Sequence, residues 1–110
     1  MKKAKFDAEL YSKLGINGLI LFSMNSVIEK GKECTFEILI KECFTDFPKA
    51  FSFKSHPQWP DSRKLDRALR SLRNQNFIIG DPKTYFNLTK AGKKTAEDIS
   101  KNFHQRKLFK

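Results

Sequence analysis

Cysteine, proline and glycine are scarce in this chain of 110 residues, which contains two, four and five of them respectively. The two cysteines are Cys34 and Cys43. They are too few for a metal site with His56 and His104, because these histidines stand isolated in the sequence. Cys43 falls on an apolar helical pattern and is expected to pack in the core. We therefore expect a reducing, cytoplasmic setting, with no metal and no cofactor.

A long hydrophobic run is also missing. The apolar stretch Ile16–Ile28 covers 13 residues and is interrupted by Asn and Ser, whereas a membrane-spanning helix needs about 20 residues. Basic residues near the start resemble the beginning of a signal peptide, but Asp7 and Glu9 follow and no cleavage site does. These features predict a soluble protein that stays inside the cell, with no membrane partner.

Catalytic signatures are absent from the sequence as well. It shows no Ser, His and Asp in the order of a catalytic triad, no cluster of metal-ligating residues, no paired carboxylates and no glycine-rich phosphate loop. It also has no internal repeat and no low-complexity linker, and its length fits one compact domain with a small core. We expect a single domain over residues 1–110 that is not an enzyme and takes no small-molecule ligand.

Acidic residues are few in the second half of the chain, where basic residues gather. The chain carries 22 Lys and Arg against 12 Asp and Glu, a net charge of +10. Residues 1–60 hold nine basic and seven acidic side chains, whereas residues 61–110 hold thirteen and five, a net charge of +8. Such an excess suits a polyanionic partner, nucleic acid first and an anionic membrane second.

The stretch Asp61–Asn76 predicts an amphipathic helix at the start of this basic half. Pro60 prevents the helix from beginning earlier, and Asp61 or Ser62 can cap its first turn. Its apolar stripe consists of Leu65, Ala68, Leu69 and Leu72. The opposite side carries Arg63, Arg67, Arg70 and Asn74, flanked by Lys64, Ser71 and Arg73.

The arginine-rich side of this stretch admits two interpretations. Guanidinium groups are planar, bidentate donors that fit guanine edges and phosphates, and the helix start at Ser62 can meet a phosphate. The alternative is an ordinary solvated charged face. We favour nucleic-acid binding, because only Asp66 interrupts the positive charge and a face that serves solubility alone would mix the two signs.

Two longer helices are predicted before this stretch. The first begins near Ile16 and ends before Gly31, where a left-handed backbone suits glycine. The second follows Thr35, a good N-cap, and ends at Pro48. Residues 7–14 predict a shorter helix ahead of both. The apolar residues expected in the core are Leu19, Ile20, Met24, Leu39, Ile40, Leu65, Leu69 and Leu72.

The connector Pro48–Pro60, which reads PKAFSFKSHPQWP, is rich in proline and aromatic residues. The alternation at Phe51–Phe53 predicts a very short strand. Such a connector could stack a nucleobase, but a Phe or Trp in a loop of this kind more often closes the core, and we favour that role here. In the helix before it, Ile38 points away from the apolar stripe and is expected to be exposed, as a partner contact or as an ordinary surface residue.

A β-hairpin and a last helix are predicted after the basic helix. Phe77–Ile79 and Thr84–Leu88 read as short strands, and Gly80–Lys83 between them has turn chemistry with Lys83 at the tip. Thr89 is expected to cap a helix that runs to about His104.

The order of these elements resembles a winged helix-turn-helix domain. The residues that carry the resemblance are LRSLRNQNFII at Leu69–Ile79 and YFNLTKAG at Tyr85–Gly92, and it covers about residues 16–104. It implies an α+β, mainly α fold, with a three-helix core, a two-stranded wing and additional terminal helices. The segment between Phe47 and Asp61 departs from the pattern, because it spans about a dozen residues where the motif's turn has three or four.

The resemblance further implies a mode of DNA binding. The basic helix would enter the major groove and residues 80–85 would form the wing beside the DNA backbone, held there by Lys64, Arg73, Lys83 and Tyr85. We therefore expect a small DNA-binding protein, a transcriptional regulator or an accessory factor, which would be nucleoid-associated in a bacterium or archaeon. The alternative is an adaptor subunit of a larger assembly, or an RNA-binding protein.

Apolar residues near the two ends of the chain predict a homodimer, because one winged helix covers only about half of a typical operator. The first strip is Phe6, Leu10 and Leu14, and the second is Gly92, Ala96, Ile99 and Phe103. Neither strip is required by the expected three-helix core, so both are available for a two-fold interface. The alternative is that both strips fold back onto their own domain, with Phe6 against Phe103.

Overall fold

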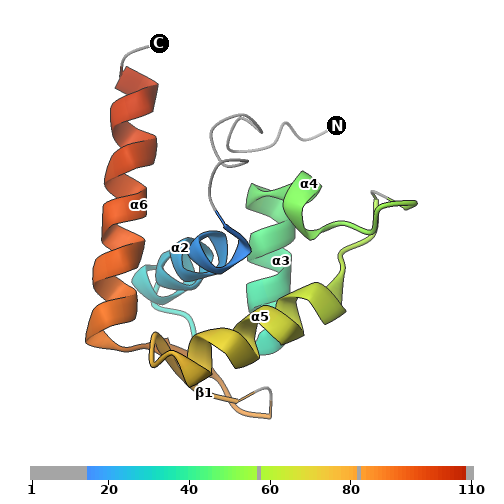
Figure 1. Cartoon of the computed structure of the whole chain (residues 1–110), viewed down its shortest axis with the longest axis horizontal. Helices are drawn as coiled ribbons and strands as arrows, with labels where there is room; N and C mark the ends of the chain where they lie inside the picture. Colours follow the sequence, from blue (N-terminus) through green and yellow to red (C-terminus); the bar gives the residue numbers. More distant parts are fainter. Residues whose placement is uncertain (1–14, 57, 82, 109–110) are drawn as a thin grey trace.

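The structure, a computed structural model, describes residues 15–56, 58–81 and 83–108, with side chains up to Lys101. In this part of the chain the elements are α2 (Ile16–Glu29), α3 (Phe36–Asp46), α4 (Pro48–Phe51), α5 (Ser62–Asn74), β1 (Ile78–Gly80), β2 (Phe86–Leu88) and α6 (Lys90–Leu108) (Figure 1). The predicted mainly helical α+β class is confirmed. The helix expected over residues 7–14 lies outside the described residues.

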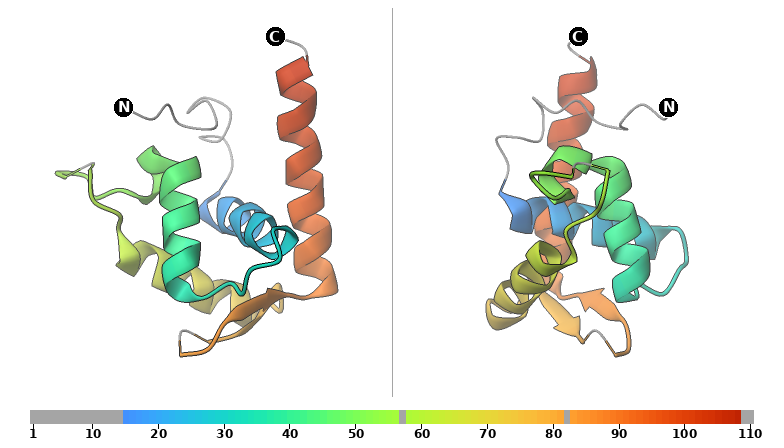
Figure 2. Two further views of the ribbon diagram at one scale, coloured as in Figure 1. Left: turned by 180° about the vertical axis from the view of Figure 1, so that it is seen from behind. Right: turned by 90° about the vertical axis from the view of Figure 1, so that its right-hand side faces the viewer.

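Helix α2 is the centre of the packing. Helices α3, α5 and α6 and strand β2 all contact it, and α6 crosses it at a steep angle (Figure 1). Because α2 is covered from several directions, Leu19, Ile20, Leu21 and Met24 are all buried. The C-terminal part of α6 projects beyond the other described elements (Figure 2). Among the described helices, none combines the length and the apolar character needed to cross a membrane.

The predicted helix ends are confirmed at three places. Gly31 follows α2 with a φ of +77°, a left-handed conformation that an L side chain would strain. The Thr35 hydroxyl accepts a hydrogen bond from the amide of Ile38 at 3.3 Å and caps α3. The Asp61 carboxylate accepts one from the amide of Lys64 at 3.2 Å and caps α5.

The segment between α3 and α5 differs from its prediction. Pro48 ends α3 but also begins α4, because proline fits the first helical turn, where its missing amide proton has no partner to lose. Phe51 is buried at the end of α4 and is not part of a strand, so the short strand predicted there is wrong. Ser52, the next residue, forms an isolated bridge with Pro60. In α3, Ile38 is half-buried against the core and is not an exposed residue.

The hairpin is confirmed, although β1 begins one residue later than predicted and β2 is shorter than predicted. Its strands are antiparallel and pair Ile78 with Leu88 and Gly80 with Phe86. Ile78 and Phe86 are buried, whereas Ile79 faces solvent, as the alternation of side chains along a strand requires. The amide of Phe86 donates to the carbonyl oxygen of Cys34 at 2.8 Å, which ties the hairpin to the segment before α3.

The apolar strip of α6 belongs to the core of its own chain. Ala96 and Ile99 are buried, and a Cβ atom at Gly18 of α2 would lie 3.1 Å from the Ile99 Cδ1 atom. The premise that this strip is spare surface is therefore wrong, because α6 uses it to cover α2. The strip formed by Phe6, Leu10 and Leu14 lies outside the described residues, as does the side chain of Phe103.

Candidate nucleic-acid interface

Helix α5 divides into a buried and an exposed side as its periodicity predicts. The side toward α2 buries Leu65, Ala68, Leu69 and Leu72. Of the α5 residues predicted to contact DNA, seven are exposed: Ser62, Arg63, Lys64, Arg67, Arg70, Arg73 and Asn74. Ser71 is half-buried at the flank. The helix therefore presents a continuous basic side while its other side completes the core.

Three basic side chains of this face have partners within the chain. Arg70 Nη2 lies 3.2 Å from Asp66 Oδ2, one turn earlier in the helix, so part of its charge is neutralised. Arg73 Nη1 donates to the carbonyl oxygen of Gly80 at 2.8 Å and thereby links α5 to the hairpin. Lys64 Nζ donates to the carbonyl oxygen of Ala50 at 2.9 Å.

Arg63 and Arg67 differ from these three residues. Within the described part of the chain, neither guanidinium has an ion-pair or hydrogen-bond partner. They stand four residues apart, so their side chains lie on the same side of the helix. Two unpaired guanidinium groups of this kind are available for phosphate or base contacts, and Arg63 lies close to the positive end of the helix dipole.

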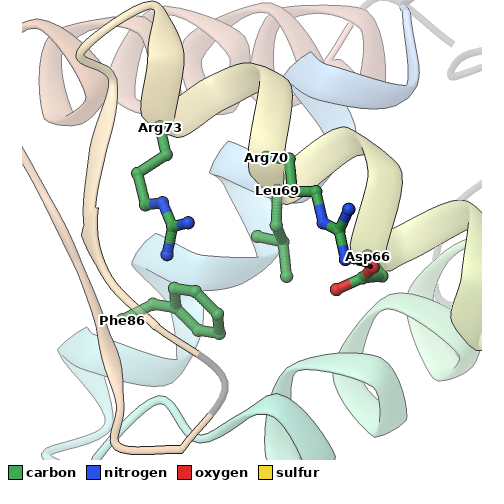
Figure 3. A pocket seen from close by; sticks show the side chains of 5 residues that line it. All are labelled: Asp66, Leu69, Arg70, Arg73 and Phe86. Atoms are coloured by element: carbon green, nitrogen blue, oxygen red, sulfur yellow. Dashed lines mark ion pairs between the residues drawn. The ribbon is translucent and has the colours of Figure 1, made fainter.

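A hollow of about 330 Å³ separates α5 from the hairpin (Figure 3). Leu69 and Phe86 give it an apolar floor, and the Asp66–Arg70 ion pair lies at one side. The side chain of Arg73 extends from α5 toward the Phe86 ring (Figure 3). Because residues of both elements line this hollow, the helix and the hairpin are neighbouring parts of one surface.

The hairpin tip is ordered by Asp81. Its Oδ1 atom accepts a hydrogen bond from the amide of Lys83 at 2.8 Å, and its carboxylate is therefore used in the turn. Lys83 and Tyr85, both predicted to contact DNA, are exposed beyond this turn. Tyr85 and Ile79 expose 50% and 57% of their surfaces, so the hairpin presents apolar as well as basic side chains.

No protein-family model, curated protein or solved structure matches this chain.

The two cysteines offer no reactive thiol. Burial raises the pKa of Cys34 to about 12, and burial likewise raises the pKa of Cys43. Both thiols are therefore protonated near neutral pH and are poor nucleophiles. In the described ranges, no three His, Cys, Asp or Glu residues come together in a way that could hold a metal ion.

The expectation that a Phe or Trp of the connector before α5 closes the core is confirmed by Phe51, which is buried. The other two rings, Phe53 and Trp59, are instead 40% and 53% exposed. The aromatic and proline residues of the connector are visible in the sequence, but composition alone does not tell which ring faces inward.

Proposed function

We propose that this chain binds double-stranded DNA through α5 and the hairpin, as a winged helix-turn-helix regulator or DNA-associated accessory factor. The observation that carries the proposal is the pair Arg63 and Arg67, which lack partners in the described structure and project from a helix whose opposite side is core. The order of the elements, with the hairpin directly after α5, supports it. So does the net charge of +8 over residues 61–110.

Some of these residues would contact bases and others would contact the DNA backbone. Arg67 and Asn74 would reach base edges in the major groove, where arginine pairs with guanine and asparagine with adenine. Lys83 and Tyr85 would hold the DNA backbone beside the groove. Arg73 would mainly keep the hairpin at its angle to α5, because its guanidinium already binds the Gly80 carbonyl oxygen.

A homodimer remains part of this proposal, since an operator with two half-sites requires two copies of the reading helix. Its interface would have to use residues other than Ala96 and Ile99, which are buried. The exposure of Ile79 and Tyr85 supports the second candidate function, a protein adaptor that docks through the hairpin.

Duplex binding is expected to be strong at low salt and to weaken steeply as salt rises, because each neutralised phosphate releases counterions. Fluorescence anisotropy of a labelled random-sequence duplex, titrated at about 50 and 200 mM salt, measures this. The double variant R63Q/R67Q should lose affinity and lower the salt slope by about two. A wild-type protein that leaves the anisotropy unchanged at micromolar concentration would contradict DNA binding and favour the adaptor.

Substitutions in α5 and in the hairpin should have different effects on DNA binding. On a duplex selected from a random library, Arg67→Ala and Asn74→Ala should each cost about 1–3 kcal/mol and relax the sequence preference. Lys83→Ala should weaken all duplexes alike and lower the salt slope by about one. Lys101→Ala, on an exposed part of α6, serves as the control. Equal effects of the first three variants on selected and random DNA would refute the groove assignment.

A further inference from the structure

The loop that precedes α5 presents three aromatic side chains to solvent. We call Phe53, His56 and Trp59 the aromatic loop. Phe53 and Trp59 are 40% and 53% exposed, and His56 is exposed as well. In Figure 1 this part of the chain extends outward from the helices, between the end of α4 and the start of α5. The proposed duplex contacts do not use these residues.

The aromatic loop is an ordered feature. The amide of Phe53 donates to the carbonyl oxygen of Trp59 at 3.0 Å, and the amides of His56 and Trp59 donate to the carbonyls of Phe53 and His56 at 3.2 and 3.0 Å. The bridge between Ser52 and Pro60 closes its base. These hydrogen bonds fix the backbone that carries the rings before any partner arrives, which lowers the entropy lost on binding.

Two of the rings already form a stack. The centroids of His56 and Trp59 lie 4.5 Å apart, with an angle of 4° between the ring planes. Trp59 nevertheless leaves about half of its surface open, with 53% exposed. An exposed, flat ring with a second ring behind it is suited to extend the stack by one more planar group.

The surroundings of the aromatic loop are basic. Residues 47–60 contain two lysines and no acidic residue. A hollow of about 590 Å³ is lined by Phe53 together with Arg63, Lys64 and Arg67 of α5. Asp61 also lines it, but its carboxylate caps α5. The hollow therefore joins the aromatic loop, through Phe53, to the two arginines that have no partner in the described structure.

Flat rings beside guanidinium groups are the combination with which proteins hold unpaired nucleotides. In a blunt duplex the faces of the inner bases are covered by their neighbours, so the aromatic loop would find few faces to stack on. We propose that the aromatic loop stacks an unpaired base of a single-stranded DNA extension. The part of this inference that places a duplex on α5 rests on the proposed function, whereas the stacking itself does not.

The single tryptophan of the chain makes the test direct, because all tryptophan fluorescence comes from Trp59. Three probes are compared: a blunt duplex, the same duplex with a short thymidine extension, and oligothymidine alone. We expect oligothymidine and the extended duplex to quench the fluorescence, whereas the blunt duplex leaves it nearly unchanged. The extended duplex should also bind more tightly than the blunt one.

Substitution of Trp59 separates stacking from charge. Trp59→Ala should weaken binding of the extended duplex roughly 5- to 150-fold, the range seen when a base-stacking aromatic residue is truncated. Its affinity for the blunt duplex should not change, and Trp59→Phe should restore most of the loss. Because Trp59 is exposed, the thermal melt should be unaltered, which shows that the variants fold.

Each other result has a defined meaning. No quenching by oligothymidine, or equal weakening of blunt and extended duplexes by Trp59→Ala, would overturn the proposal. A blue shift of Trp59 emission on anionic phospholipid vesicles, without quenching by oligothymidine, would assign the aromatic loop to a membrane surface and would also overturn it. Quenching by oligothymidine in a protein that does not bind the blunt duplex would support stacking and refute the proposed duplex function.

Discussion

Gly92→Ala should lower the free energy of unfolding by about 3 kcal/mol, because the added methyl group has no room. A Cβ atom at this position would overlap the backbone carbonyl oxygen of Phe77 and lie 3.3 Å from Leu88 Cδ2. The Phe77 carbonyl cannot move away easily, since it accepts a hydrogen bond from the amide of Thr89 and lies 3.1 Å from the Thr89 hydroxyl. The substitution forces α6 away from the hairpin.

Gly15→Ala provides the matched control. A Cβ atom at Gly15 meets nothing within 4 Å, and its φ of −70° suits any residue. Urea denaturation of both variants, followed by circular dichroism, gives the two unfolding free energies. We expect Gly15→Ala to change stability by less than about 0.5 kcal/mol. Equal stability of the two variants would show that α6 does not meet the hairpin at Gly92.

The position of Gly92 illustrates where prediction from sequence stopped. Small residues along the last helix indicated a close approach, and that inference was correct. The sequence leaves a second chain or the same domain as the partner, and the structure gives the same domain: the Phe77 carbonyl for Gly92 and helix α2 for Ile99. Helical periodicity identifies an apolar strip, whereas the surface that covers it depends on how distant parts of the chain meet.

Patterns among residues close together in the sequence were sufficient to predict α5 and the hairpin that follows it. The cap at Asp61, the buried stripe and the hairpin turn each depend on residues a few positions apart, so spacing and turn chemistry determine them. The end of α5 is less regular. The helix stops at Asn74, and Asn76 takes a φ of +64°, which asparagine tolerates better than most residues.

The sequence could predict which side of α5 is basic and exposed, but not all of the partners that its side chains have within the chain. The Asp66–Arg70 pair follows from i,i+4 spacing and could have been found in the sequence. The bond from Arg73 to the Gly80 carbonyl could not, because it requires the hairpin to fold back beside α5. Exposure of Trp59 was likewise hidden, since Phe51 and Trp59 are both aromatic and only packing decides which is buried.

Leu65→Ala should lower the free energy of unfolding by about 4 kcal/mol, and Leu69→Ala by about 2 kcal/mol, although both residues belong to the same stripe of α5. Leu65 is 0% exposed, so its truncation leaves an enclosed cavity that neighbouring atoms fill poorly. Leu69 is 3% exposed and lines the hollow beside Phe86, so its truncation enlarges a space that already opens to solvent.

Paired melts of these two variants test the orientation of α5 independently of any DNA measurement. Arg67→Ala is the control, since an exposed arginine without a partner in the described structure should change stability by less than about 0.5 kcal/mol. Below their melting temperatures, both leucine variants should bind duplex DNA like the wild type, because neither side chain lies on the basic side. Loss of stability in Arg67→Ala with none in Leu65→Ala would mean that the basic side of α5 faces the core, and the proposed interface would then fail with it.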